Sequence, residues 1–89
     1  MNEHDKLLDR MMQGTSDGRF WFHGMCSLLR KLGFQEHIRR NRHIFTKDNI
    51  EEILNLQPRA GLRAKPYQVK QVRQIIRKYS LGDREEDDR

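Results

Sequence analysis

The stretch Ile38-Arg39-Arg40-Asn41-Arg42-His43-Ile44-Phe45 decides the fold, because it is predicted to form the turn between two short strands. The sequence on either side, residues 34–38 and 43–46, is rich in aromatic and β-branched residues, which favours strands. Asn41 is the residue that we expect at a positive φ, since asparagine accepts this conformation most readily after glycine. The stretch therefore predicts an antiparallel hairpin whose tip carries three arginines and a histidine.

The side chains at this tip are suited to chemistry on a phosphodiester. Guanidinium groups bind and neutralise phosphate oxygens. Histidine gives or takes a proton near neutral pH more readily than any other side chain. Two interpretations follow from these residues alone: either the histidine acts on a phosphodiester, or the arginines decorate a solvated hairpin.

Two helices are predicted before the hairpin. Residues 3–13 are expected to form a short helix with one apolar stripe of leucine and methionine, followed by a loop over residues 14–18. The aromatic run Phe20-Trp21-Phe22 is expected to be a hydrophobic anchor. A second helix is predicted over residues 22–32, with Gly33 as the residue that follows its end. This helix should cover one side of a sheet.

Three antiparallel strands and a last helix are predicted after it. The strands are expected over residues 34–39, 43–47 and 52–57, and the apolar residues of the third do not alternate strictly enough to show which face is buried. For the same reason, the sequence does not show which face of the sheet the side chain of His43 occupies. Residues 59–64 are predicted to form a flexible basic loop. Pro66 suits the first position of a helix that closes at residues 81–82, with Lys70, Arg73 and Arg77 on its exposed face.

This order of elements predicts an α+β fold, with helices packed on one face of a three-stranded antiparallel sheet. The other face and the hairpin tips would be open to a ligand. We divide the chain into an N-terminal helix and loop over residues 1–18, a folded domain over residues 19–82 and an acidic tail over residues 83–89. The tail is predicted to be disordered.

The charge distribution indicates a polyanionic partner. The net charge is +5, but residues 59–78 hold seven cations and no acid, and residues 30–47 hold six cations against Glu36. Residues 82–89 have the opposite balance, with five acids against two arginines. A basic body suggests nucleic acid first and an acidic protein surface second.

Several classes of protein are excluded by composition. The single cysteine, Cys26, rules out an internal disulfide and fits a reducing compartment. The sequence has no apolar run of membrane-spanning length and no signal peptide, so a soluble, cytoplasmic protein is expected. The four histidines and the cysteine lack ligand spacing, so we predict neither a metal site nor a cofactor.

Three stretches, together with the order of elements over residues 22–81, resemble the HicA family of small bacterial toxins. They are Leu29-Arg-Lys-Leu-Gly-Phe34, Arg42-His-Ile-Phe-Thr46 followed by Glu51-Glu-Ile-Leu-Asn-Leu-Gln-Pro58, and Ala64-Lys-Pro-Tyr-Gln-Val-Lys-Gln-Val-Arg73. The last two resemble a longer subgroup of the family that carries an N-terminal extension. The resemblance implies a fold like that of a double-stranded-RNA-binding domain. It also implies ribosome-independent endoribonuclease activity on mRNA, and neutralisation by a HicB-like antitoxin.

The resemblance also implies a catalytic residue. The Gly-Ser-His motif of the family, aligned without gaps, falls on Arg40, Asn41 and Arg42, and a second family histidine falls on His43. His43 is therefore the candidate general acid/base. A guanidinium beside it would stabilise the charge of the transition state. The surface expected to hold the RNA backbone consists of Arg39, Arg40, Arg42, Lys47, Arg63 and Lys65.

Two alternatives to an enzyme are kept. The first is a catalytically weak or inactive RNA-binding module of the same fold, which a His43 pointing into the core would favour. An exposed His43 within a phosphate's reach of Arg42 would favour the enzyme. The second alternative is a DNA-binding protein that uses the last helix, with Lys70, Arg73 and Arg77 on phosphates.

Overall fold

The computed structural model describes residues 2–82, so the predicted acidic tail lies outside the described residues. Six elements form the main architecture: α1 (Glu3–Gln13), α2 (Phe22–Lys31), β1 (Gln35–Arg39), β2 (Arg42–Lys47), β3 (Ile50–Leu56) and α3 (Pro66–Tyr79). Four short elements join them: 3-10 turns η1 (Asp17–Arg19) and η2 (Ala60–Leu62), and strands β4 (Pro58–Arg59) and β5 (Arg63–Ala64). The predicted helices and main strands are confirmed, with ends that differ by one or two residues.

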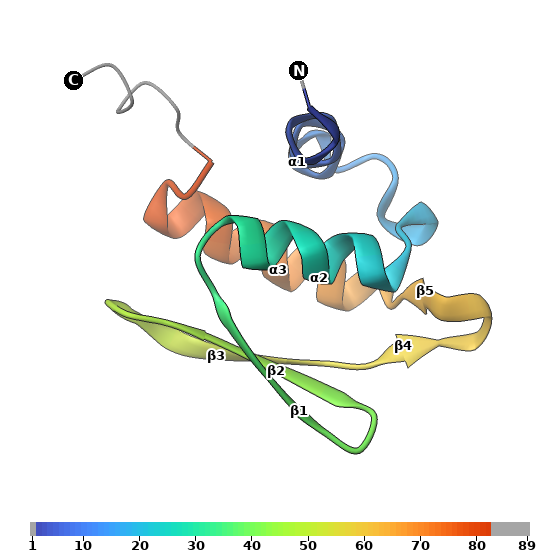
Figure 1. Cartoon of the computed structure of the whole chain (residues 1–89). Helices are drawn as coiled ribbons and strands as arrows, with labels where there is room; N and C mark the ends of the chain where they lie inside the picture. Colours follow the sequence, from blue (N-terminus) through green and yellow to red (C-terminus); the bar gives the residue numbers. More distant parts are fainter. Residues whose placement is uncertain (1, 83–89) are drawn as a thin grey trace.

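The elements are arranged in layers (Figure 1). The three main strands form an antiparallel sheet in the order β1-β2-β3, and α2 and α3 cover one of its faces (Figure 1). α1 packs on these two helices on the side away from the sheet (Figure 1). The α+β class is thereby confirmed. Across the described part of the chain, no helix is long and apolar enough to span a membrane.

The register of the strands settles which residues face the helices. Glu36 lies opposite Phe45, and Phe45 lies opposite Leu54. Phe45, Leu54 and Leu56 are buried, whereas Ile53, the residue before Leu54 on β3, is exposed. Because side chains alternate along a strand, the even-numbered residues of β1 and β3 and the odd-numbered residues of β2 around His43 and Phe45 face the helices.

The aromatic anchor before α2 is divided between core and surface. Phe20 and Phe22 are fully buried. Trp21, which lies between them in the sequence, faces solvent and is 57% exposed. The anchor prediction is confirmed for the two phenylalanines and is wrong for Trp21. Burial of each phenylalanine contributes about 1.5–3 kcal/mol, which fixes the start of α2 over the sheet.

The hairpin tip differs from the prediction in which residue takes the positive φ. Arg39 pairs with Arg42, so Arg40 and Asn41 form a two-residue loop. Arg40, at φ 57°, adopts the left-handed conformation, and Asn41 does not. The prediction for Asn41 was wrong, because a loop of this length can place the positive φ at its first position. The Asn41 side chain instead accepts a hydrogen bond from Gln57.

Residues 59–64 are more ordered than the predicted loop. Pro58 pairs with Ala64 and Arg59 with Arg63, which makes a two-stranded ladder around η2. The turn closes through Gly61 at φ 76°, and the Ala64 amide donates to the Phe20 carbonyl at 2.8 Å. Strands of two residues carry too little periodicity to be detected in a sequence.

The prediction that Arg73 lies on an exposed face of the last helix was wrong. Arg73 is buried, and its guanidinium donates to both carboxylate oxygens of Asp17, at 2.8 and 3.0 Å, and to the Met11 carbonyl at 3.1 Å. The hydrogen bonds from Arg73 hold the pKa of Asp17 below its usual range. Arg73 therefore ties α1 and η1 to α3, and is not available for a DNA-binding surface.

We expect Arg73→Met to destabilise the protein by about 2–4 kcal/mol, because it removes one partner of a nearly buried ion pair. Arg77→Met is the matched control: Arg77 lies one turn later on α3 and is exposed, and its one hydrogen bond within residues 2–82 goes to the Met12 carbonyl at 3.3 Å. Urea unfolding followed by circular dichroism measures both. Equal destabilisation of the two variants would contradict the role given to Arg73.

Candidate nucleic-acid interface

The uncovered face of the sheet carries the arginines of the hairpin. His37 on β1 lies opposite Ile44 on β2, which in turn lies opposite Asn55 on β3, so these three form one row across the sheet. Arg39 and Arg42 form the next row toward the tip. These residues alternate with the buried ones, so they share the face that lies away from α2 and α3 (Figure 1).

A hollow of about 560 Å³ opens at the tip of this face. It is lined by Arg39, Arg40, Asn41, Arg42, Ile44, Asn55 and Gln57. Within residues 2–82 this lining consists of three guanidinium groups, three side-chain amides and one apolar side chain, without a carboxylate. The guanidinium groups of this hollow attract an anion, and its amides offer hydrogen-bond donors and acceptors to a polar ring of the same ligand.

A chain of hydrogen bonds holds the tip in relation to α3. Gln57 donates from Nε2 to Oδ1 of Asn41 at 3.3 Å, and its Oε1 accepts from the Lys65 ammonium at 3.4 Å. The backbone N–H of Gln57 donates to Oε1 of Gln68, in the first turn of α3, at 3.2 Å. The position of the arginine hairpin is therefore set partly by the start of the last helix.

The six residues predicted to hold RNA fall in three places. Arg39, Arg40 and Arg42 meet around the hollow, and Lys65 is linked to it through Gln57. Lys47 lies at the other end of β2, where its side chain packs beside Gly33. The Arg63 guanidinium stacks on the exposed ring of Trp21 at 4.4 Å. The structure thus brings three of the six together at the tip and links a fourth, Lys65, to them through Gln57.

His43 lies on the opposite face, under α2. Its side chain is 14% exposed and its ring meets the Phe22 ring edge-on, with centroids 4.8 Å apart. Its Nδ1 donates to the Glu36 carboxylate at 2.7 Å. His37 does not lie beside it, because Ile38 is the residue opposite His43. The sheet therefore separates His43 from the arginines of the uncovered face.

Glu36 holds His43 in place. The other oxygen of its carboxylate accepts from Nε of Arg30 at 2.8 Å. Burial raises the pKa of Glu36, but the hydrogen bonds from His43 and Arg30 outweigh it, so the pKa lies below its ordinary value. Glu36 is consequently a carboxylate at neutral pH, and it fixes the orientation of the His43 ring.

Cys26 completes a group of three potential metal ligands. Its thiol sulfur, a Glu36 carboxylate oxygen and a His43 ring nitrogen all lie within 4.8 Å of one another. Cysteine, histidine and glutamate are all zinc ligands, and they come from three elements, so their spacing in the sequence gives no signal. Glu36 is already bonded to Arg30 and His43, so a metal would have to displace one of these bonds. The absence of a metal site stays a prediction.

The thiol itself is unreactive as a nucleophile. Burial, with a contribution from the negative charge of Glu36, raises the pKa of Cys26 to about 12. The thiolate is the reactive form of cysteine, and at neutral pH it is present in only a trace. Despite its proximity to a histidine and a carboxylate, Cys26 is not positioned for covalent catalysis.

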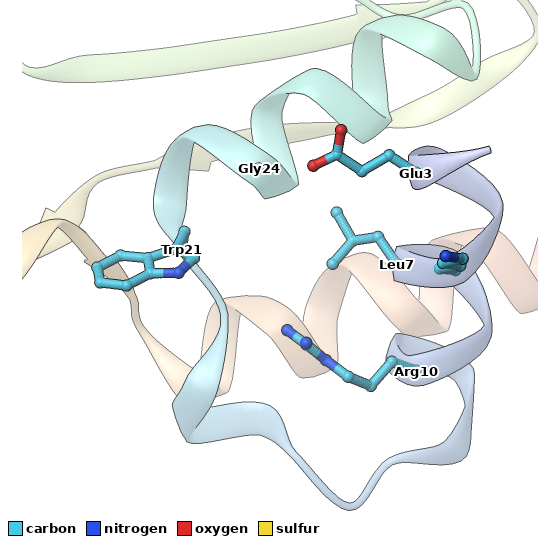
Figure 2. Close-up of a pocket in the computed structure, with 6 residues that line it drawn as sticks. Glu3, Leu7, Arg10, Trp21 and Gly24 are labelled. Atoms are coloured by element: carbon cyan, nitrogen blue, oxygen red, sulfur yellow. The ribbon is translucent and has the colours of Figure 1, made fainter.

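A second hollow lies between α1 and the start of α2 (Figure 2). It has a volume of about 300 Å³ and is lined by Glu3, Lys6, Leu7, Arg10, Trp21 and Gly24. Leu7 and Arg10 extend from α1 into the gap, and Trp21 lies on its opposite side, at the start of α2 (Figure 2). In the sequence, the signal that could have indicated this hollow is Gly24, a glycine within a predicted helix three residues after Trp21.

Comparisons with protein-family models, with curated proteins and with solved structures found no match to the chain. Function is therefore inferred from the geometry of the two faces of the sheet and from the chemistry of their side chains.

We expect Cys26 to resist alkylation in the folded protein. With its pKa raised to about 12 and its side chain buried, it should react with iodoacetamide at pH 8 at least about 100-fold more slowly than a free thiol. Mass spectrometry of the native protein and of the protein unfolded in guanidinium chloride measures the two rates. Rapid modification of the native protein would contradict this packing.

We expect Glu36→Gln to lower the free energy of unfolding at pH 7 by about 1.5–3 kcal/mol, the range for hydrogen bonds to charged groups. Because the pKa of Glu36 is lowered in the folded state, its contribution is present above the ordinary pKa, near pH 4, and is lost as the pH falls through the lowered value. The variant should therefore lose less stability than the wild type on acidification.

Glu51→Gln is the matched control for this effect, since Glu51 is exposed on β3. Urea unfolding at several pH values between 7 and 2.5, all chosen around the ordinary carboxyl pKa, compares the three proteins. A Glu36→Gln variant that follows the wild type at every pH would exclude a stabilising role for the Glu36 hydrogen bonds.

Proposed function

We propose that this chain is a HicA-like protein of a toxin-antitoxin pair that binds mRNA through the tip of its arginine hairpin. The observation that carries the proposal is the hollow of about 560 Å³ on the uncovered face, around which Arg39, Arg40 and Arg42 converge. RNA binding is the function that this geometry supports best.

The charges at the hollow favour a polyanion over a single small anion. Three guanidinium groups lie on consecutive parts of one hairpin, and a guanidinium contacts two phosphate oxygens at once. Among the described residues, no carboxylate lines the hollow to oppose them. Phosphates that bind there release counterions, which makes the affinity depend on salt. The amides of Asn41, Asn55 and Gln57 add donors and acceptors that suit a nucleotide better than a phosphate alone.

Two features of the backbone support the family assignment and the finer fold. The order from α2 to α3, with three antiparallel strands between two helices, is the order expected of a domain like a double-stranded-RNA-binding domain. Arg40, the residue aligned with the glycine of the Gly-Ser-His motif, is the one that has a positive φ of 57°. The alignment therefore places the glycine of the family motif at a position whose backbone conformation favours glycine.

A HicB-like antitoxin and a cytoplasmic location are part of the same proposal. An antitoxin that neutralises RNA binding would cover the hairpin arginines with an acidic surface. Such charge pairs are screened by salt, so the complex should weaken as the ionic strength rises.

Endoribonuclease activity on mRNA is the second candidate, with His43 as the acid/base that the resemblance implies. The observation in its favour is the 2.7 Å hydrogen bond from His43 to Glu36, because a carboxylate that orients an imidazole is a common arrangement for proton transfer. The location of His43 under α2 favours a binding module, so binding is the better supported of the two functions.

We expect Arg42→Ala and Arg40→Ala each to weaken RNA binding about 5- to 10-fold, since each removes a guanidinium that binds phosphate. Fluorescence anisotropy with a labelled single-stranded RNA measures the affinity at several salt concentrations. The slope of log affinity against log salt should become shallower by about 0.7 for each phosphate that the variant no longer neutralises.

Lys31→Ala is the control for these variants, because Lys31 is an exposed cation at the end of α2, away from the hollow. Equal weakening by all three substitutions would mean that only net charge matters and would contradict a site at the hairpin. RNA recovered intact after prolonged incubation with the wild type would reject the second candidate.

A further inference from the structure

The uncovered face of the sheet carries an imidazole of its own, that of His37. Its neighbours on β1, Glu36 and Ile38, lie opposite Phe45 and His43 and face the helices, so His37 faces outward. His37 is exposed, and no hydrogen bond or ion pair engages its side chain in the described residues. An unengaged imidazole is free to contact a ligand bound on this face.

His37 lies close to two of the hairpin arginines. Arg39 is two residues along the same strand, about 7 Å away between Cα atoms. Arg42 is the diagonal neighbour of His37, because His37 pairs with Ile44, and such neighbours are about 7–8 Å apart. Arginine side chains are long enough to cover these separations. One phosphodiester bound between the strands can therefore contact the imidazole and both guanidinium groups.

No other histidine in the described residues has this arrangement. His43 is separated from the arginines by the sheet itself and is held by Glu36. His4 is bonded to Ser27, between α1 and α2, and His23 lies on α2, which covers the opposite face (Figure 1). His37 alone among them shares a face and adjacent rows with the guanidinium groups.

We propose that His37 is a catalytic residue, the general base of RNA cleavage on the uncovered face; this rests on the proposed function. His37 takes the proton of a ribose 2′-hydroxyl, and the 2′-oxygen attacks the adjacent phosphorus. The bond from phosphorus to the 5′-oxygen breaks, and that oxygen takes a proton from water. The products are a 2′,3′-cyclic phosphate and a 5′-hydroxyl, and His37 returns its proton to solvent.

The guanidinium groups of Arg39 and Arg42 stabilise the charge that develops on the non-bridging oxygens during this step. Both belong to the row next to His37, within side-chain reach of a phosphate that the imidazole contacts. In this assignment His43 is a positioning residue, which keeps the hairpin in register through Glu36.

The experiment compares cleavage and binding in the same set of variants. The substrate is a labelled single-stranded RNA, and the binding probe is the same sequence with 2′-deoxy sugars throughout, which cannot be cleaved by this route. The variants are His37→Ala, His37→Gln and His43→Gln, with His23→Ala as the matched exposed-histidine control. Circular dichroism verifies that each variant is folded.

We expect both His37 variants to lose at least about 100-fold in cleavage rate, the lower limit for a general acid/base. Their affinity for the deoxy probe should change by less than about threefold. His23→Ala should retain cleavage within about tenfold, His43→Gln should lose less cleavage than the His37 variants, and wild-type products should end in a 2′,3′-cyclic phosphate.

Three other outcomes would overturn the assignment in distinguishable ways. Wild-type protein that binds the probe but leaves the RNA intact would remove catalysis and keep the binding function. Cleavage that persists in the His37 variants, or that disappears only in His43→Gln, would move the chemistry off the uncovered face. Wild-type protein that does not bind the probe at all would overturn the proposed function together with His37.

Discussion

A sheet that is covered on one face only forces every strand residue either under the helices or into solvent, and this constraint organises the molecule. Because side chains alternate along each strand, one residue of difference in position reverses the surroundings completely. His37 and His43 lie on adjacent strands, yet one shares the uncovered face with arginines and the other packs against Phe22 and Glu36. Because of the same alternation, Leu54 lies in the core and its neighbour Asn55 lines the hollow.

Polar groups that the fold does bury are fully engaged. Among the described residues no buried side-chain nitrogen or oxygen lacks a hydrogen-bond partner. Arg73 is bonded to Asp17 and Met11, and Glu36 to Arg30 and His43. Since an unpaired buried polar group would cost about 1–3 kcal/mol, this arrangement contributes to specifying one structure. It also means that the interior has little capacity left for chemistry, in contrast with the uncovered face, where the side chain of His37 has no hydrogen-bond partner within residues 2–82.

The extent of the helices was predictable because their apolar residues repeat with the helical period, and the main strands were predictable from their aromatic and β-branched residues. The same strand signals predicted the arginine hairpin, and with it the grouping of Arg39, Arg40 and Arg42. Arg73 was not predictable, because its burial depends on Asp17, which lies 56 residues earlier in the chain. The face occupied by His43 required the register with Ile38 and Leu56, and the apolar run of β3 is compatible with either face. The positive φ of Arg40 depends on how the loop closes, which the propensity of Asn41 does not determine.

The pairing of Asp17 with Arg73 has a consequence for how the protein is made. The hydrogen bond from Arg73 to Met11 spans 62 residues, so α1 acquires its second packing partner, α3, only after α2 and the whole sheet have been synthesised. Contacts this distant in sequence form late, after the entropy of closing a long loop has been overcome. On the ribosome, α1 can therefore pack only on α2 until α3 has emerged. Premature termination before α3 would leave α1 without the surface that α3 supplies and Asp17 without its ion-pair partner, so the complete packing of the N-terminal segment is coupled to the synthesis of α3.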